Sequence, residues 1–98
     1  MIVKTGPLLF HVAVGVAFLF PHQRQAIEVI LSEAGDWLRY TGNCWIVSGV
    51  GPIQGWAEKL RTVPGMNTAS ILIVDIGNEY TGYLTPEAWE WLKKFRPN

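Results

Sequence analysis

The sequence has few charged side chains. Asp, Glu, Lys and Arg make up 16% of its 98 residues, below the ~25% typical of soluble domains. Hydrophobic residues make up 49% and aromatic residues 12%. A single small domain with so little charge exposes apolar surface, and such surface usually marks a contact with a partner. We expect that partner to be a second copy of the chain.

Neither sign of charge is in excess. Eight basic and eight acidic side chains cancel, and the calculated isoelectric point is 6.7. Proteins that bind phosphate backbones without sequence preference normally carry a basic surplus. The charge therefore does not support a nucleic-acid partner, although a local basic patch stays open.

Cysteines and long apolar runs are also scarce. Cys44 is the single cysteine, so no internal disulfide forms and a reducing, cytoplasmic location is expected. The apolar run Leu8–Phe20 contains His11 and is shorter than the ~20 residues that span a bilayer. No cleavage site of small residues follows it. We interpret this run as a strand and expect no membrane association.

The length fits one domain, residues 1–98, because two would each lack an interior. Within Leu8–Phe20, large side chains such as Phe10 and Val12 alternate with smaller ones such as His11 and Ala13. We expect the large face of this strand to receive helices. The small face should meet another flat surface closely.

Hydrophobic periodicity and turn residues predict the remaining elements. They are a helix over His22–Ala34 with a left-handed cap at Gly35, a hairpin of Asp36–Tyr40 and Asn43–Ser48, a helix over Pro52–Arg61, a strand Ile71–Ile76, a short extended piece Tyr80–Leu84, and a helix that starts at Thr85-Pro86-Glu87. The strand Ile71–Ile76 is apolar on both faces, which predicts a position in the middle of the sheet.

This order predicts an α+β, ferredoxin-like fold: a β-α-β-β-α-β antiparallel sheet, then a C-terminal strand or hairpin and a third helix. Both early helices would cover one face of the sheet. The other face would display Cys44 or Trp45, depending on the register. Either the last helix or a second copy must cover it, and we favour a homodimer to which Tyr80–Phe95 contributes.

Several segments resemble the SinR-like branch of the small CRISPR-associated ferredoxin-fold proteins of the adaptation-nuclease type. The resemblance covers roughly the last two-thirds of the chain. The segments are Ala34-Gly35, Trp37-Leu38-Arg39-Tyr40, Cys44-Trp45-Ile46-Val47, the helix through Trp56 and Leu60, the strand Ile71–Ile76, Thr81-Gly82-Tyr83 and Trp89-Glu90-Trp91-Leu92.

The resemblance implies a ferredoxin-like fold, a symmetric dimer and, in some members, metal-dependent cleavage of nucleic acid. In the nuclease relatives an aspartate at the end of the first strand holds a cation across the dimer axis. Here that strand ends Val16-Ala17-Phe18-Leu19, with no carboxylate. A hard cation needs oxygen ligands, so this departure argues against catalysis.

Asp75 and Glu79 are the one carboxylate pair near a strand end. They could form a metal site or an acid–base pair, completed by His11 or His22. The alternative is that Asp75 bonds to the Gly77-Asn78 turn while Glu79 is solvated. We favour the alternative, because aspartate beside a turn commonly has this local role.

Other residues have a functional and a structural interpretation. His11 could be a ligand or a general base, or a packed histidine near an interface. Cys44 begins an apolar strand and is expected to be an inert thiol. The candidate interface anchors are Trp37, Trp45, Trp89 and Trp91. Stacking of these rings on unpaired bases is the alternative. We do not favour it, because the lysines and arginines are scattered along the sequence rather than grouped around these rings.

Our first hypothesis is a non-catalytic, homodimeric binding module with no cofactor, with a protein partner favoured over nucleic acid. One alternative is a nuclease that uses Asp75, Glu79 and a divalent metal ion. A further alternative is a small-molecule-binding dimer, like the ferredoxin-fold monooxygenases, with His11 lining a pocket behind the sheet.

Overall fold

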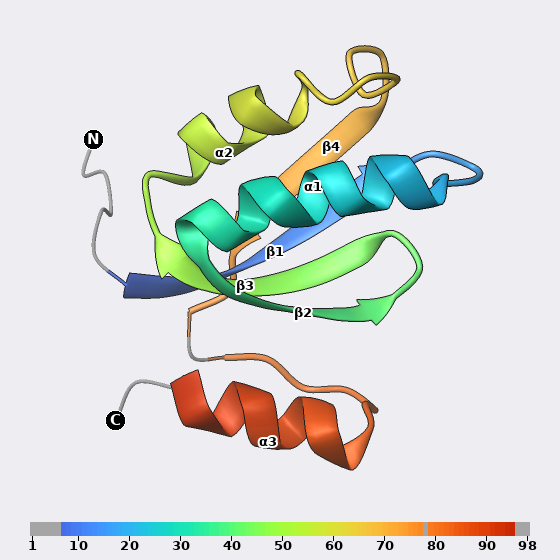
Figure 1. The fold of residues 1–98 in the computed structure, drawn as a ribbon. Coiled ribbons are helices and arrows are strands. Elements are labelled where there is room, and N and C mark those ends of the chain that lie inside the picture. Colours follow the sequence, from blue (N-terminus) through green and yellow to red (C-terminus); the bar gives the residue numbers. More distant parts are fainter. Residues whose placement is uncertain (1–6, 78, 96–98) are drawn as a thin grey trace.

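The computed structural model describes residues 7–77 and 79–95, and Figure 1 shows their arrangement. The elements in chain order are β1 (Pro7–Gly15), α1 (Pro21–Ala34), β2 (Gly35–Thr41), β3 (Cys44–Val50), α2 (Ile53–Leu60), β4 (Ser70–Asp75) and α3 (Pro86–Phe95). None of the helices in these two ranges is long and apolar enough to cross a bilayer.

The strands form one antiparallel sheet in the order β2-β3-β1-β4. Helices α1 and α2 lie on one face of this sheet, and α3 lies on the other (Figure 1). The molecule is flat, with extents of 38 × 35 × 19 Å. The predicted α+β class, the antiparallel sheet and the third helix are confirmed.

Strand β1 lies in the centre of the sheet, and its side chains contribute to the packing on both faces. Phe10, Val12 and Val14 point towards α1 and α2, where they join Ile27 and Leu31 in the main core. The prediction that the large face of β1 receives helices is confirmed. The strand ends at Gly15 rather than continuing to Phe20, and residues 16–20 form the connection to α1.

Trp45 belongs to this main core, although the sequence suggested it as an interface anchor. The register pairs Trp45 with Val12, which places its ring on the face that α1 and α2 cover. The residue is fully buried, and its Nε1 donates to Glu28 Oε2 at 3.0 Å. The ring is therefore unavailable to a partner, and the prediction for Trp45 is wrong.

Helix α1 passes into β2 without a linker. Gly35 is extended, with φ 163°, so the predicted left-handed cap is wrong. The chain has no room to turn, because Gly35 pairs with Gly49 and both backbones lie close together. A Cβ on Gly49 would stand 2.6 Å from the Ala34 carbonyl oxygen, and one on Gly35 would collide with the Ser48 carbonyl. Glycine is needed here for close approach.

Strand β4 lies at the edge of the sheet, so the prediction of a central strand is wrong. Ile71 and Ile73 pack against the main core. Leu72 and Val74 point to the other face and are 62% and 42% exposed. In this strand, the apolar residues of one face are packed, and those of the other face are left uncovered by the described residues.

The segment Tyr80–Leu84 forms no strand, so the predicted C-terminal strand or hairpin is wrong. The segment crosses beside the sheet as an irregular connection and delivers the chain to α3 (Figure 1). The helix starts where predicted, since Ala88 N donates to Thr85 Oγ1 at 3.2 Å. This bond satisfies one of the free N–H groups of the first turn.

Candidate functional site

The sheet face opposite α1 and α2 is covered unevenly. At one end α3 packs Leu92 against Leu9 and Ile46, and all three are buried. Trp91 Nε1 also donates to Asp36 Oδ2 at 3.1 Å, which ties α3 to β2. We call the three residues Ala13, Leu72 and Val74, which lie on the β1–β4 side of the same face, the bare patch.

His11 and Tyr40 form a polar pair in the middle of this face. The register places His11 between Ile46 and Val74. Its Nε2 lies 2.5 Å from the Tyr40 hydroxyl, and the two ring centroids are 5.6 Å apart. The residues are 29 positions apart in the sequence, so the strand register brings them together.

Both members of the pair are uncharged at neutral pH. Burial lowers the pKa of His11 below 6.5, which favours the neutral imidazole. Burial also raises the pKa of the Tyr40 phenol above 10, and the nearby Cys44 adds to the shift. The pair offers hydrogen-bonding groups without net charge.

A pocket of about 330 Å³ opens over this pair. Its wall is formed by His11, Tyr40 and Ile46 of the sheet, by Ile76, Tyr80, Thr81, Gly82, Tyr83 and Leu84 of the connection, and by Leu92 of α3. None of these ten residues is Asp, Glu, Lys or Arg. A wider hollow along Leu38–Thr41 shares Tyr40, Tyr83 and Leu84 with the pocket.

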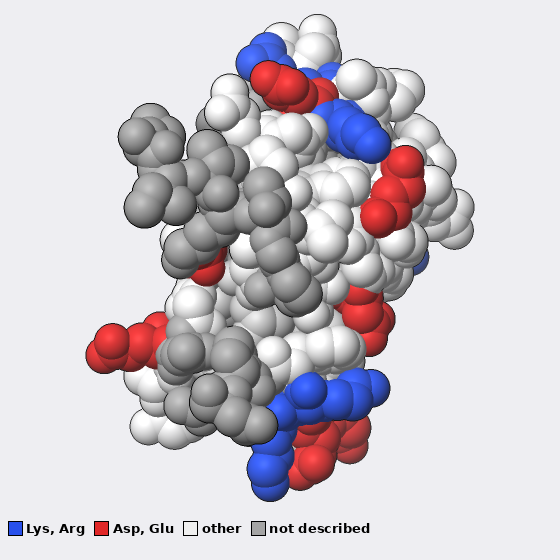
Figure 2. All heavy atoms as spheres, turned by 90° about the vertical axis from the view of Figure 1, so that its left-hand side faces the viewer, with Lys and Arg blue, Asp and Glu red and all other residues white. Residues whose placement is uncertain are grey.

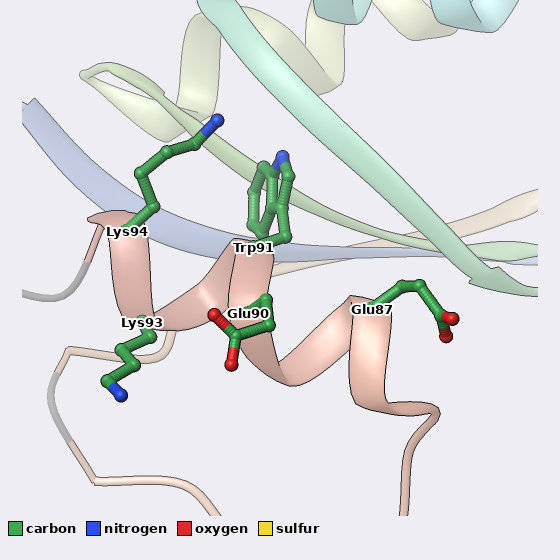
Figure 3. Close-up of a pocket in the computed structure, with 5 residues that line it drawn as sticks. All are labelled: Glu87, Glu90, Trp91, Lys93 and Lys94. Carbon is green, nitrogen blue, oxygen red and sulfur yellow. The ribbon is translucent and has the colours of Figure 1, made fainter.

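A second hollow lies on α3 and is lined by Glu87, Glu90, Trp91, Lys93 and Lys94. Figure 3 shows that these side chains diverge: Trp91 and Lys94 rise towards the sheet, while Glu90 and Lys93 point away from it. The Trp91 indole is already bonded to Asp36. Groups that point apart cannot act together on one ligand.

The structure does not bring the predicted carboxylate site together with His11. Asp75 pairs with Phe10, so it lies on the helix-facing side of the sheet, whereas His11 points to the other side. Asp75 Oδ1 accepts a bond from Gly77 N at 3.0 Å, and Glu79 is exposed. Asn78 of the predicted turn lies outside the described residues.

His22 lies in the first turn of α1, on the opposite side of the sheet from His11. Its ring stacks on Phe20, with the centroids 5.8 Å apart. Within residues 7–77 and 79–95, no three His, Cys, Asp or Glu side chains gather closely enough to hold a metal ion.

The remaining predicted anchors are packed within the chain. Trp37 packs against the main core, and its Nε1 donates to Ser32 Oγ at 2.8 Å. Trp89 and Trp91 pack against the small cluster beneath α3. The exposed apolar side chains on this face include the smaller Leu72 and Val74 of β4, and Val50 at the end of β3.

Tyr40 was not among the site residues predicted from the sequence. A signal existed in the hairpin, because a turn at Gly42-Asn43 brings the end of β2 beside Cys44 at the start of β3. Tyr40 then reaches the face that also carries His11.

Charged side chains form no stripe of one sign on the face that Figure 2 shows. Basic groups near the top and the bottom of this view lie beside acidic ones, and further acidic groups lie between them among uncharged residues. A phosphate backbone requires a continuous basic surface, and the described residues form none in this view.

Comparisons of the chain with protein-family models, with curated proteins and with solved structures find no match.

Proposed function

We propose that this chain is a non-catalytic, ferredoxin-like binding module that acts as a homodimer, akin to the SinR-like proteins that its sequence resembles. In this proposal a second copy covers the bare patch. The observation that supports it is the exposure of Leu72 and Val74 on a sheet face that α3 covers only at its other end.

The edge position of β4 favours a second copy as the partner. Sheet edges that stay unpaired are usually protected by lysine, proline or a bulge. Ser70–Val74 contains neither lysine nor proline, and β4 pairs with β1 in an unbroken register. An edge of this kind can pair with its own copy across a two-fold axis, which sets Leu72 and Val74 beside their counterparts.

The shape and charge of the molecule agree with this partner. A flat molecule of 38 × 35 × 19 Å offers a broad face, and a standard interface takes about 800 Å² from each partner. No residue of the bare patch is charged. An uncharged apolar surface of this kind favours a protein partner over the phosphate backbone of a nucleic acid.

The nuclease alternative gains no support from the positions of its residues. Asp75 already accepts a hydrogen bond from Gly77 and faces the helices rather than His11. A divalent metal ion would enter the function only through this alternative. The pocket beside His11 gives the small-molecule alternative a specific observation in its favour.

Light scattering coupled to size exclusion tests the dimer. The chain mass is 11.0 kDa, and we expect the unchanged protein to elute at twice this mass. Leu72→Glu places a charge in the centre of the interface and is expected to give monomers. Val29→Glu is the matched control, because Val29 is 65% exposed on α1, on the other side of the sheet.

A monomeric unchanged protein at a concentration of hundreds of micromolar would contradict the proposal. So would a Leu72→Glu protein that remains as dimeric as the Val29→Glu control.

A further inference from the structure

We propose that the pocket between the sheet and the segment Tyr80–Leu84 binds a small, neutral aromatic molecule that carries one hydroxyl group. The hydroxyl donates a hydrogen bond to the Tyr40 phenol oxygen, and the ring lies among the apolar side chains of the wall. This site goes beyond the proposed dimer and does not depend on it.

The size and composition of the pocket limit the ligand. A volume of about 330 Å³ lies at the lower end of the range of ~300–1,000 Å³ typical of ligand pockets. Ile46, Ile76, Leu84 and Leu92 supply aliphatic surface, and Tyr80 adds an aromatic ring. Such walls favour a compact apolar body.

The lack of charged side chains in the pocket wall further limits the class of ligand. The described residues that line the pocket include no acidic or basic side chain, apart from a histidine whose burial favours the neutral ring. A carboxylate or an ammonium group would lose its water without gaining an opposite charge, which is costly. The site therefore selects a neutral molecule.

The Tyr40 hydroxyl specifies the polar group of the ligand. A phenol has one hydrogen to donate and two lone pairs that accept. His11 Nε2 forms one hydrogen bond with it. In either tautomer of His11, this bond leaves at least one lone pair on the phenol oxygen, because the phenol either accepts from Nε2 through one lone pair or donates its hydrogen to Nε2. A ligand that donates one hydrogen bond can use this lone pair, and an aromatic alcohol does so.

Three probes of nearly equal size test the assignment by amide-resolved NMR titration at neutral pH. They are 4-propylphenol, 4-propylanisole, which cannot donate, and 4-propylbenzoate, which is charged. We expect the phenol to bind about fivefold more tightly than the anisole, as one hydrogen bond predicts, and the benzoate at least tenfold more weakly. The shifted signals should lie on β1, β2 and the segment Tyr80–Leu84.

Two variants locate the hydrogen bond. Tyr40→Phe removes the proposed acceptor and keeps the ring, so the preference for the phenol over the anisole should fall below about twofold while binding of the anisole persists. Tyr83→Phe makes the same chemical change at another residue of the wall and should leave the preference intact. A native-like amide spectrum of each variant confirms that it is folded.

Four outcomes overturn the inference. They are the absence of binding by all three probes at millimolar concentration, binding of the benzoate as tight as that of the phenol, a preference for the phenol that survives Tyr40→Phe, and signal shifts confined to the bare patch. All four leave the dimer measurement unaffected, so failure of this inference is distinguishable from failure of the proposed function.

Discussion

The two faces of the sheet share the same four strands but are packed to different degrees. On the face of α1 and α2, eleven buried residues form one continuous core. On the face of α3, the described part of the chain forms a cluster of only three buried residues, and half-exposed aromatic rings surround it. Neighbouring residues of one strand, such as Phe10 and Leu9, thus belong to layers of very different depth.

This difference indicates that one layer of this small domain stabilises the fold and the other provides surface for binding. The deep layer contains most of the buried apolar side chains, and their burial is the main contribution to stability. The shallow layer holds one short helix by a few contacts and leaves a pocket and a bare patch beside it. Surface available for binding lies where packing is incomplete, because a fully packed face has nothing left to contact.

The largest expected effect comes from Leu31→Ala in the deep layer. Leu31 of α1 is fully buried, and the surrounding core cannot collapse into the space that remains. We expect a loss of about 3–5 kcal/mol in the free energy of unfolding, measured by urea denaturation. The whole domain should unfold in one transition. A loss below about 1 kcal/mol would contradict the assignment of the deep layer as the stabilising core.

Leu92→Ala makes the same chemical change in the shallow layer. Leu92 of α3 is 2% exposed, but its neighbours are half-exposed and can move into the space. We expect a smaller loss of about 2 kcal/mol, with α3 released before the sheet. Hydrogen exchange should show amides of α3 losing protection while those of β1 and β3 keep theirs. Equal loss of protection in both layers would contradict the comparison.

The smallest effect concerns His11, the titratable group at the centre of the shallow layer. Its pKa is lowered by burial, so the unfolded chain binds a proton more readily than the folded one. Stability should therefore be complete above about pH 6.5 and decrease as the pH falls from there to the folded pKa. NMR titration of the His11 ring gives this pKa. His11→Gln should remove this part of the pH dependence, and a folded pKa above 6.5 would contradict the prediction.

The helices could be predicted from the sequence because their signals are local. The apolar spacing in His22–Ala34 and the cap at Thr85 each depend on residues within one or two turns, and both helices lie where expected. The position of Ile71–Ile76 could not be predicted in this way. An apolar strand is compatible with the centre of a sheet and with an edge whose outer face awaits a partner, and the order of strands is a long-range property.

The candidate site was predicted only in part. His11 was identified from its position on the small face of β1, and Asp75 and Glu79 were identified from their closeness in sequence. Tyr40 was missed, since its contact with His11 depends on the combined register of β2, β3 and β1. Closeness in sequence was misleading for the carboxylates, because Asp75 and His11 point to opposite faces of the sheet.

The direct passage from Ala34 to Gly35 makes the chain unusually sensitive to length at this point. A single inserted residue would have no loop to occupy, because helix and strand adjoin. Side chains alternate along a strand, so a shift of one position would invert every side chain of β2 between this insertion and the hairpin turn. Asp36 would leave α3, and Tyr40 would leave the pocket. The junction between α1 and β2 thereby determines whether Asp36 and Tyr40 reach the face of the sheet that carries α3 and His11.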